Sequence, residues 1–462
     1  MRHALYRTVF LLLAVTLSAR AQDASLSPTR STLANGLTVL VVEQRGLPLT
    51  AVRLVVLAGS AFDPPGKEGV AALTALLLDK GAGNRSASQV AETVDFRGGT
   101  LEVDHTHDAT FVTASMLSRD TDVFLELMAD MVIRPSLAEE EYLRERENLL
   151  ASLARTQENA SYLTDVFFNR FLFGAHPYGR PELGADSSVA RLTREDIVAF
   201  HRSWYVPNNA FMIIACDVHT TDVMRTARRL FEGWRKRPLP RTVFAAPPAV
   251  NGFSLHVVDK PDLSQTHVRM GTLALPRNHP NHIPLAVAST ILGGGFSSRL
   301  VSRIRVDRGL TYDIRSRIAP RRERGAFVVS TFTKTETTGE MVEAVLEELR
   351  QFRRTGVTEA DVLAARQYLS GVFPLSLQGP RALTDQIVDM ELYGLPADYL
   401  RTYTDRLRAV TVGEVARVIR RYVPDDEAIL CVLLGPADRI IPQIEHFGTV
   451  RRHSMDVQPV EP

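Results

Sequence analysis

Apolar positions along the chain follow two different periods. Short apolar runs such as LTVLVVEQ and TAVRLVVLAGS are typical of buried strands. Longer segments carry apolar side chains at helical spacing, as in residues 139–155, where Leu143, Leu150 and Leu153 form the stripe. Because strands come in consecutive runs and long helices follow, the pattern predicts an α+β fold with mostly antiparallel sheets backed by helices.

This order of elements occurs twice. RLTREDIVAFHRSWYVPNNAFMIIACDV in the first half corresponds to AVTVGEVARVIRRYVPDDEAILCVLLGP in the second. Each copy predicts a helix with a Thr cap and an acidic residue at its third position, then Tyr-x-Pro, then a strand. The first two strands of each half also correspond, more loosely. The repeat unit is roughly 220 residues, so the sequence predicts two homologous domains.

A linker is expected between the copies. The stretch KRPLPRTVFAAPPAVN is rich in proline and basic residues and has no strand or helix period. The expected organisation is a signal peptide at 1–21, a first domain at 29–235, the linker at 236–251, a second domain at 252–450 and a tail at 451–462.

The first residues resemble a secretory signal. Arg2 and Arg7 precede an apolar run at 9–17, and the small-x-small triplet that ends at Ala21 is a cleavage signal. The run is roughly half the ~20 residues that a membrane helix needs, and no later stretch comes closer. We therefore expect a protein without a membrane span, in a bacterial periplasm or secreted, after cleavage near Ala21.

Charge and cysteine content narrow the functional classes. The chain has 54 Lys and Arg against 53 Asp and Glu, so its overall charge does not indicate binding to nucleic acid or an anionic membrane. Cys216 and Cys431 lie in apolar strand-like runs of separate copies, which predicts two buried thiols and no disulfide between them.

The segment GSAFDPPGKEGVAALTALLLDKGAG, residues 59–83, carries a specific family signal. It closely resembles the zinc-site segment of the pitrilysin/insulinase family of zinc peptidases, in which a Gly-Ser strand end leads to G-x-A-H-x-x-E-H and then K-G-T. Gly69, Ala71 and Lys80-Gly81 match this pattern. The resemblance implies two homologous domains of the mitochondrial-processing-peptidase-like type.

The metal ligands of that family are absent from the matching positions. The family motif needs two histidines on one helical face to hold zinc and a glutamate between them as the base. A further glutamate ligand of the family follows in a helix reading R-E-x-x-x-E-E, to which Arg146-Glu147 corresponds. The lost positions are Ala72, Ala75 and Leu76 in the first motif and Ala151 and Ser152 in the second. The sequence therefore predicts no metal and no cofactor in this chain, and no zinc peptidase activity of the chain alone.

Two histidines elsewhere in the first domain are candidates for a substitute metal site. His105 and His107 in DHTHD would share one face of a strand, a spacing that can support a metal. A lone His-x-His without a further cluster is more often polar surface or cleft lining. Its place soon after Gly98-Gly99 suggests a strand at a cleft edge, so we expect substrate contact rather than metal binding.

The second copy keeps another motif, GGGFSSRLVSRIRVDRGLTYDI, at residues 293–314. The pattern predicts a helix that Gly309 ends and a strand at 310–314 that presents Tyr312. The stretch resembles the family's second-domain signature S-R-L-x-x-x-L-R-x-x-x-x-L-x-Y, in which Arg305 and Tyr312 match the substrate-clamping pair. Secondary candidates are Gly293, Gly294 and Gly295, which permit close backbone approach, and Arg299, with a structural role.

The resemblance implies that this Arg/Tyr pair faces a zinc domain across a closed chamber and holds a peptide against a partner's metal. A phenol can donate to a developing oxyanion, and a guanidinium can hold peptide carbonyls. The leading hypothesis is a non-catalytic, substrate-binding subunit that pairs with a zinc-bearing H-x-x-E-H subunit of the same family to cleave peptides or small proteins. The alternative is a zinc-free scaffold or peptide-binding protein, possibly a homodimer. An independent enzyme is disfavoured because no Ser/His/Asp or Cys/His constellation stands out.

Overall fold

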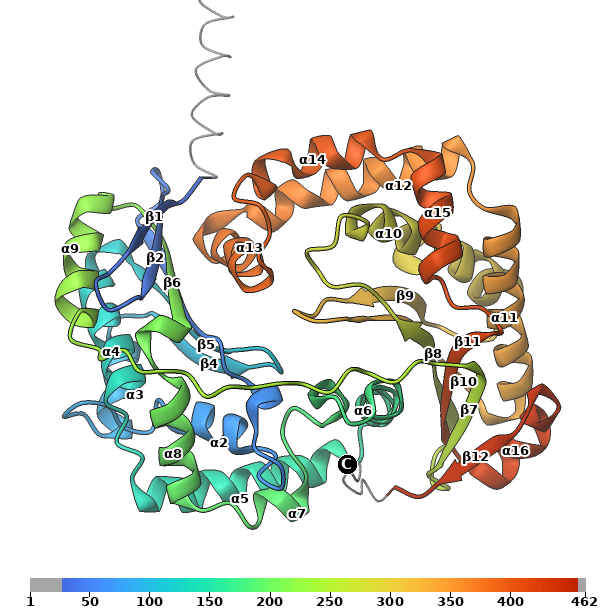
Figure 1. Cartoon of the computed structure of the whole chain (residues 1–462), viewed down its shortest axis with the longest axis horizontal. Coiled ribbons are helices and arrows are strands. Elements are labelled where there is room, and N and C mark those ends of the chain that lie inside the picture. The colour runs from blue at the N-terminus through green and yellow to red at the C-terminus, as the bar shows by residue number, and fades with distance from the viewer. Residues whose placement is uncertain (1–26, 456–462) are drawn as a thin grey trace, which may run out of the picture.

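Two six-stranded sheets, one from each half of the chain, form the framework of the protein (Figure 1). The computed structural model describes residues 27–455. The strand order is β1-β2-β6-β3-β5-β4 in the first sheet and β12-β7-β11-β8-β10-β9 in the second. The first sheet contains β1 (Thr29–Thr32), β2 (Thr38–Glu43), β3 (Leu49–Val56), β4 (Thr100–His105), β5 (Thr110–Leu117) and β6 (Ala210–Cys216). The second contains β7 (Gly252–Asp259), β8 (Gln265–Leu273), β9 (Ile314–Ala319), β10 (Ala326–Lys334), β11 (Ala428–Gly435) and β12 (Val450–His453).

Most neighbouring strands run antiparallel. The exceptions are β2 with β6 in the first sheet, and β7 with both β11 and β12 in the second. Strands β2, β6, β3, β5 and β4 follow the same spatial order as β7, β11, β8, β10 and β9. The predicted α+β fold with two homologous, mostly antiparallel sheets backed by helices is therefore confirmed.

The helix before β6, α8 (Arg194–Trp204), and the helix before β11, α15 (Val412–Tyr422), start in the same way. Thr193 accepts a hydrogen bond from the backbone N–H of Asp196, and the Asp196 carboxylate accepts one from the backbone N–H of Thr193. Thr411 and Glu414 form the same capping box in the second half. Each box satisfies backbone donors that a helix start leaves free, so the repeated Thr-x-x-acid pattern determines where both helices begin.

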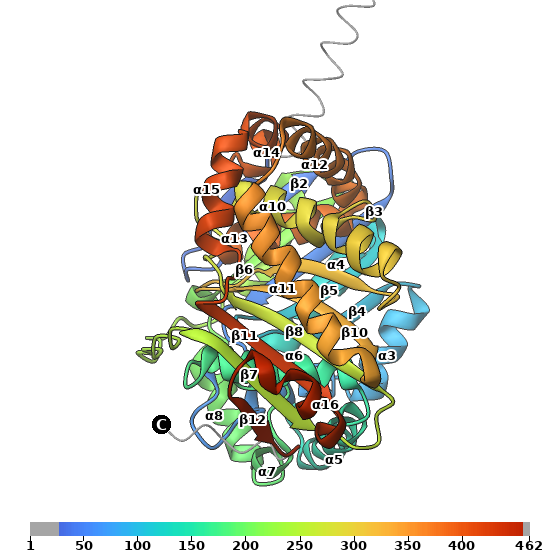
Figure 2. The same ribbon diagram turned by 90° about the vertical axis from the view of Figure 1, so that its right-hand side faces the viewer.

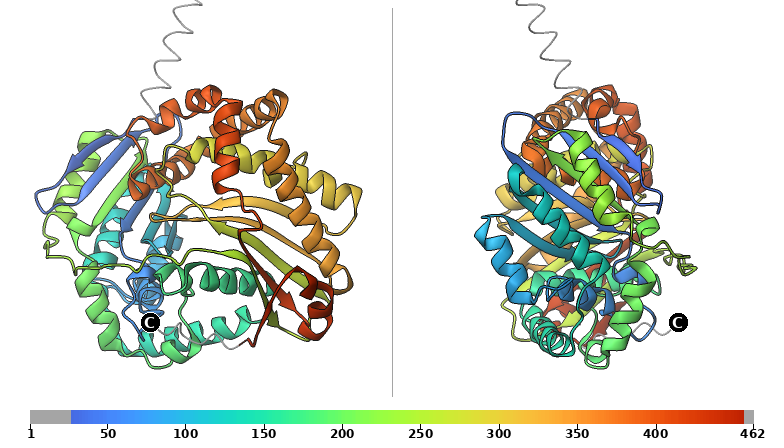
Figure 3. Two further views of the ribbon diagram at one scale, coloured as in Figure 1. Left: turned by 45° about the vertical axis from the view of Figure 1, so that its right-hand side comes forward. Right: turned by 90° about the vertical axis from the view of Figure 1, so that its left-hand side faces the viewer.

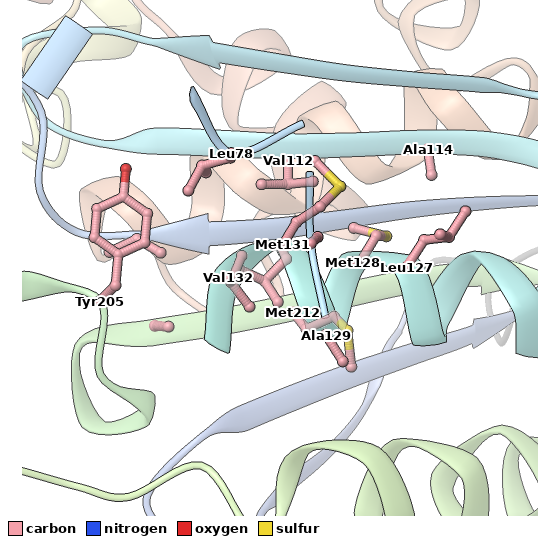
Figure 4. Packing of buried hydrophobic residues seen from close by; sticks show 14 of the residues in the cluster. Leu78, Val112, Ala114, Leu127, Met128, Ala129, Met131, Val132, Tyr205 and Met212 are labelled. Carbon is pink, nitrogen blue, oxygen red and sulfur yellow. The ribbon is translucent and has the colours of Figure 1, made fainter. Parts of the chain in front are cut away.

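Helices cover both faces of each sheet. On one face of the first sheet, α4 places Leu127, Met128 and Met131 against Val112 of β5 and Met212 of β6 (Figure 4). Helices α11 and α16 cover the corresponding face of the second sheet (Figure 2). The helices of the first half are α2 (Val70–Leu77), α3 (Ala87–Phe96), α4 (Thr121–Ile133), α5 (Glu139–Thr156), α6 (Ala160–Phe173), α7 (Asp186–Val189), α8 (Arg194–Trp204) and α9 (Thr220–Phe231). Those of the second half are α10 (His282–Ser289), α11 (Thr338–Thr355), α12 (Glu359–Val372), α13 (Gly379–Tyr393), α14 (Tyr399–Ala409), α15 (Val412–Tyr422) and α16 (Ala437–Ile444).

One helix from each half of the chain packs on the sheet of the other half. Helix α13 packs on β3 and β6 of the first sheet, where Leu383 and Ile387 are fully buried (Figure 1). Helix α6 packs on β8 and β11 of the second sheet through Phe167 and Phe168 (Figure 3). Because each apolar sheet face is covered from the other half, the two domains stabilise one another through buried apolar surface.

Residues 236–251 contain neither helix nor strand and run between the two sheets. Phe244 of this stretch packs edge-on against Phe62, with ring centroids 5.5 Å apart. Cys216 on β6 and Cys431 on β11 are buried free thiols on strands that hold the same place in the two sheets, as predicted.

Two details differ from the expectations drawn from the sequence. The buried face of α5 consists of Tyr142, Glu145, Leu149 and Leu153, whereas Leu143 is 40% exposed, because the helix turns its Tyr142 side toward the loop before α8, where the Tyr142 hydroxyl donates to the carbonyl of Leu192. Residues 451–453, assigned above to the tail, belong to β12, which pairs in parallel with β7 from Val450 onward.

The expected signal peptide at 1–21 lies outside the described residues. Within residues 27–455, no helix is both long and apolar enough to cross a membrane.

Candidate functional site

Helix α2 carries the positions of the first metal motif. It begins after Gly69, whose φ of 100° is a left-handed conformation that favours glycine. The carboxylate of Asp63 accepts hydrogen bonds from the backbone N–H groups of Gly69 (2.7 Å) and Ala71 (2.9 Å), and so caps the helix. Burial raises the pKa of Asp63 to about 8, and these two backbone donors offset the effect only in part. The loop and helix geometry of a motif segment is thus retained.

The residues at the metal positions do not fit a zinc ion. Ala72 and Ala75 are buried with 0% and 2% exposure, and Leu76 is half-buried against the same core. These side chains end in methyl groups, which offer no lone pair to a metal. On α5, which packs against α2, Ala151 is exposed and Ser152 half-buried. Within residues 27–455, no group of three or more His, Cys, Asp or Glu side chains is placed to hold a metal ion.

The two histidines near β4 are held by the segment after α6. His105 is the last residue of β4, an edge strand, and its Nε2 lies 3.2 Å from the carbonyl oxygen of Glu182. His107 lies in the turn beyond the strand, not on it, and is 2% exposed. Its Nε2 donates to the carbonyl of Arg180 (2.9 Å), and its Nδ1 contacts the Glu182 carboxylate (2.5 Å). Both nitrogens of His107 are therefore engaged within the protein.

Glu182 connects this turn to the second domain. Burial raises the pKa of its carboxyl, but the hydrogen bond from His107 and the charges of His107 and Arg321 outweigh this and hold the pKa at about 2. The guanidinium of Arg321 lies 3.4 Å from Glu182 and stacks over the ring of Tyr178. Tyr178 in turn donates to Asp108 (2.5 Å). This network joins the β4–β5 turn to the β9–β10 loop, so His107 belongs to a set of polar contacts that connects the two domains.

Arg305 and Tyr312 lie on the surface of the second domain. Arg305 belongs to the π-helical segment η6 (Val301–Asp307), which ends before Gly309. Tyr312 stands in a bend before β9, which begins at Ile314, so the expectation of a strand at 310–314 that presents Tyr312 is wrong: only Ile314 of that range is in a strand. Its ring is 84% exposed. A phenol with this exposure is accessible to a bound molecule and can donate a hydrogen bond to it.

The glycine turn and Arg299 have different roles. A Cβ on Gly293 would lie 2.4 Å from the backbone nitrogen of Ser316 on β9, so this position requires glycine, whereas Gly295 has open space around it and Gly294 only ordinary contacts. Arg299 forms an ion pair with Glu348 of α11 (2.5 Å) and stacks on Phe352. These contacts agree with the structural role expected for Arg299.

The structure adds one residue that sequence reasoning passed over. Phe296 is 77% exposed and its ring lies below the guanidinium of Arg305, with 5.2 Å from the guanidinium carbon to the ring centroid. Val306, the residue after Arg305, is also exposed (65%). A large aromatic directly after three glycines was the signal available in the sequence.

Comparisons with known proteins cover nearly the whole chain. The family model for "Insulinase (Peptidase family M16)" matches residues 38–185, and the model for "Peptidase M16 inactive domain" matches residues 191–369. The second match starts before α8 and β6, so it begins within the segment that completes the first sheet.

Two relatives are similar in sequence to this chain along nearly their full length. The chain is 30% identical to an uncharacterized zinc protease of Mycobacterium bovis over 430 residues, which cover 91% of this chain and 96% of the relative. An uncharacterized zinc protease of Bacillus subtilis is 21% identical, over 88% of this chain and 98% of that relative.

Solved structures match the same fold. A crystal structure described as a peptidase M16 inactive domain from Pseudomonas fluorescens superposes with a TM-score of 0.83 at 25% identity, and covers 93% of this chain and 100% of that one. The crystal structure of a protease from Helicobacter pylori gives 0.77 at 24% identity, with 88% and 99% covered.

Proposed function

The chain belongs to the insulinase (M16) family of peptidases, and within that family we propose that it is a non-catalytic, substrate-binding subunit that works with a separate zinc-bearing subunit. The observation that carries the proposal is a contrast between two sites. Helix α2 keeps its cap and packing while Ala72, Ala75 and Leu76 replace ligands and base. In the second motif, in contrast, both Arg305 and Tyr312 are present, with Tyr312 exposed and Arg305 half-buried.

In this role the chain supplies donors rather than a metal. The Tyr312 hydroxyl would donate to the carbonyl oxygen of the peptide bond under attack, where negative charge develops. The Arg305 guanidinium has five N–H donors in a fixed plane and would hold neighbouring carbonyls or a carboxylate of the same peptide. The zinc ion would be bound by an H-x-x-E-H subunit of the same family, since nothing at Ala72, Ala75 or Leu76 can hold one.

The proposal is tested by reconstitution. This chain is mixed with an exported H-x-x-E-H chain from the same genome, and turnover of internally quenched peptides is measured. We expect activity only in the mixture. Tyr312→Phe and Arg305→Ala should each lower kcat/KM by about 10²-fold, as loss of one oxyanion donor does. Arg303→Ala, a change at an exposed arginine of the same segment, is the matched control and should leave turnover unchanged.

Measurement of the zinc content tests which subunit binds the metal. The isolated chain should contain no stoichiometric zinc, and the mixture about one zinc per pair. If Tyr312→Phe and Arg305→Ala leave turnover of the mixture intact, or if the chain forms only a homodimer and never enters a complex with the zinc-bearing chain, the scaffold or peptide-binding function replaces this one.

Export is part of the same proposal. The charged start, the apolar run and the small-x-small triplet that ends at Ala21 support secretion to the periplasm or beyond. Determination of the mature N-terminus checks this, and a chain that retains Met1 would contradict it.

A further inference from the structure

A pocket of about 510 Å³ opens at the C-terminal end of α15, away from the Arg305 site. It lies between that helix end, the last turns of α11, the segment after β8 and the residues just before β10. Leu275, Pro276 and Tyr422 contribute apolar surface. The basic side chains that line it are Arg324, Arg353, Arg420 and Arg421.

Most of this positive charge has no counter-charge. Arg353 pairs with Asp425 (2.6 Å) and donates to the carbonyl of Val423, so its guanidinium is used within the fold. Within residues 27–455, Arg324, Arg420 and Arg421 have no carboxylate within ion-pair distance. Three guanidinium groups around one pocket repel each other, and an anionic occupant would relieve that repulsion.

The duplication shows how the same place is filled in the first domain. Tyr205 corresponds to Tyr422, and Asn208 to Asp425, in the aligned repeats. The Asn208 side chain donates to the carbonyl of Arg237 (2.9 Å) and accepts from its backbone N–H (3.2 Å). Trp234 is 4% exposed and donates from its ring nitrogen to the carbonyl of Tyr205 (3.1 Å). An extended stretch of the chain itself, residues 234–237, thus covers the end of α8.

In the second domain, the stretch that corresponds to residues 234–237 takes a different course. In the first domain the covering stretch follows α9, and the equivalent helix of the second domain is α16. The chain after α16 forms β12 instead, which pairs with β7 at the outer edge of the sheet. The end of α15 is therefore left open in a place where the first domain holds an extended segment.

We propose that this pocket, lined by Arg324, Arg420, Arg421 and Tyr422, binds an extended, carboxylate-rich segment of a partner protein. The arginine forks fit carboxylates in bidentate geometry, and the Tyr422 and Pro276 surface fits an apolar side chain between them. β9, with its 6 residues, separates the pocket from Tyr312 by roughly 20 Å. The pocket is thus a docking site distinct from the peptide clamp.

The test uses the full chain and two labelled hexapeptides, Glu-Phe-Glu-Glu-Phe-Glu and its lysine analogue, with binding followed by fluorescence anisotropy. We expect saturable binding of the glutamate peptide, none of the lysine peptide, and weaker binding as salt is raised. The double variant R420E/R421E should weaken binding at least ~10-fold, because it reverses two of the three free charges. Arg417→Glu, an exposed charge reversal on α15 outside the pocket, should leave the affinity unchanged.

Several results would overturn the proposal. These are equal binding of both peptides, no saturable binding of either, equal weakening by R417E and R420E/R421E, or displacement of the glutamate peptide by inorganic phosphate at equal concentration, which would indicate a small-anion site. Urea unfolding of each variant establishes that it is folded. Since no peptidase activity is read, this test is independent of the reconstitution experiment.

Discussion

Arg305 is held over the face of Phe296, with its guanidinium carbon 5.2 Å from the ring centroid. Phe296 is exposed and Arg305 is half-buried, so the contact lies at the protein surface. The Phe296 ring contacts the Arg305 guanidinium and favours one orientation of the guanidinium N–H donors. Under the proposed function, Phe296 would be a positioning residue for Arg305.

Removal of this ring should weaken substrate handling without unfolding the protein. A cation–π contact at an exposed site contributes roughly 0.5–1 kcal/mol, so Phe296→Ala should lower kcat/KM of the reconstituted pair about 2–5-fold. Phe296→Trp should retain activity. In an Arg305→Ala background the same change should have no further effect, and an undiminished effect there would contradict the positioning role.

Gly69→Ala should strongly destabilise the protein. The residue has a φ of 100°, and a Cβ there would lie 2.7 Å from Cγ2 of Val189 and 2.9 Å from the carbonyl oxygen of Leu183. Left-handed strain and the clash together should lower the free energy of unfolding by about 2 kcal/mol or more. Urea unfolding measures it. The control is Gly66→Ala in the same loop, which has positive φ but open space, and an equal loss in both variants would show that the clash contributes nothing.

The free energy of unfolding should fall as the pH drops below neutrality. Burial, with a smaller effect of the Arg237 charge, lowers the pKa of His201 to about 4, and its Nε2 donates to the carbonyl of Val132 (3.0 Å). The unfolded chain binds this proton near pH 6.5 while the folded chain stays neutral, so stability is lost between pH 6.5 and about 4. One such group contributes up to roughly 1.4 kcal/mol per pH unit in that window.

Urea midpoints at pH 7.5 and pH 5.0 check this expectation. Burial also lowers the pKa values of His176 and His256 to about 4, so the wild type should lose several contributions together. His201→Gln keeps a donor for Val132 but cannot titrate, and the difference between its two midpoints should be smaller than that of the wild type. An unchanged difference would exclude His201 as a source.

Ile387→Ala should destabilise both halves at once. Ile387 of α13 is fully buried against the first sheet, although α13 belongs to the second half of the chain. Loss of a buried Ile side chain costs about 2–5 kcal/mol. We expect a single lowered transition in urea, because the helix couples the domains. Leu363→Ala on α12, where the side chain is 45% exposed, is the control. Separate transitions with only one domain affected would show that the domains unfold independently.

The sequence by itself determined the repeated elements and the chemistry lost from them. Thr193 and Thr411 specify helix starts through local capping boxes, and the side chains of Ala72 and Ala75 offer no ligand to a metal. These inferences need only contacts between residues close in the chain, or the chemistry of a single side chain.

Only the tertiary structure decided which side chains are free. It buried His107 between Arg180 and Glu182, left Tyr312 in a bend before the strand β9, exposed Leu143 and placed Phe296 beneath Arg305. It also packed α6 on the second sheet and α13 on the first, and left a pocket at the end of α15. Each of these outcomes depends on which apolar face is covered by a segment far away in the chain, and hydrophobic periodicity within one segment does not carry that information.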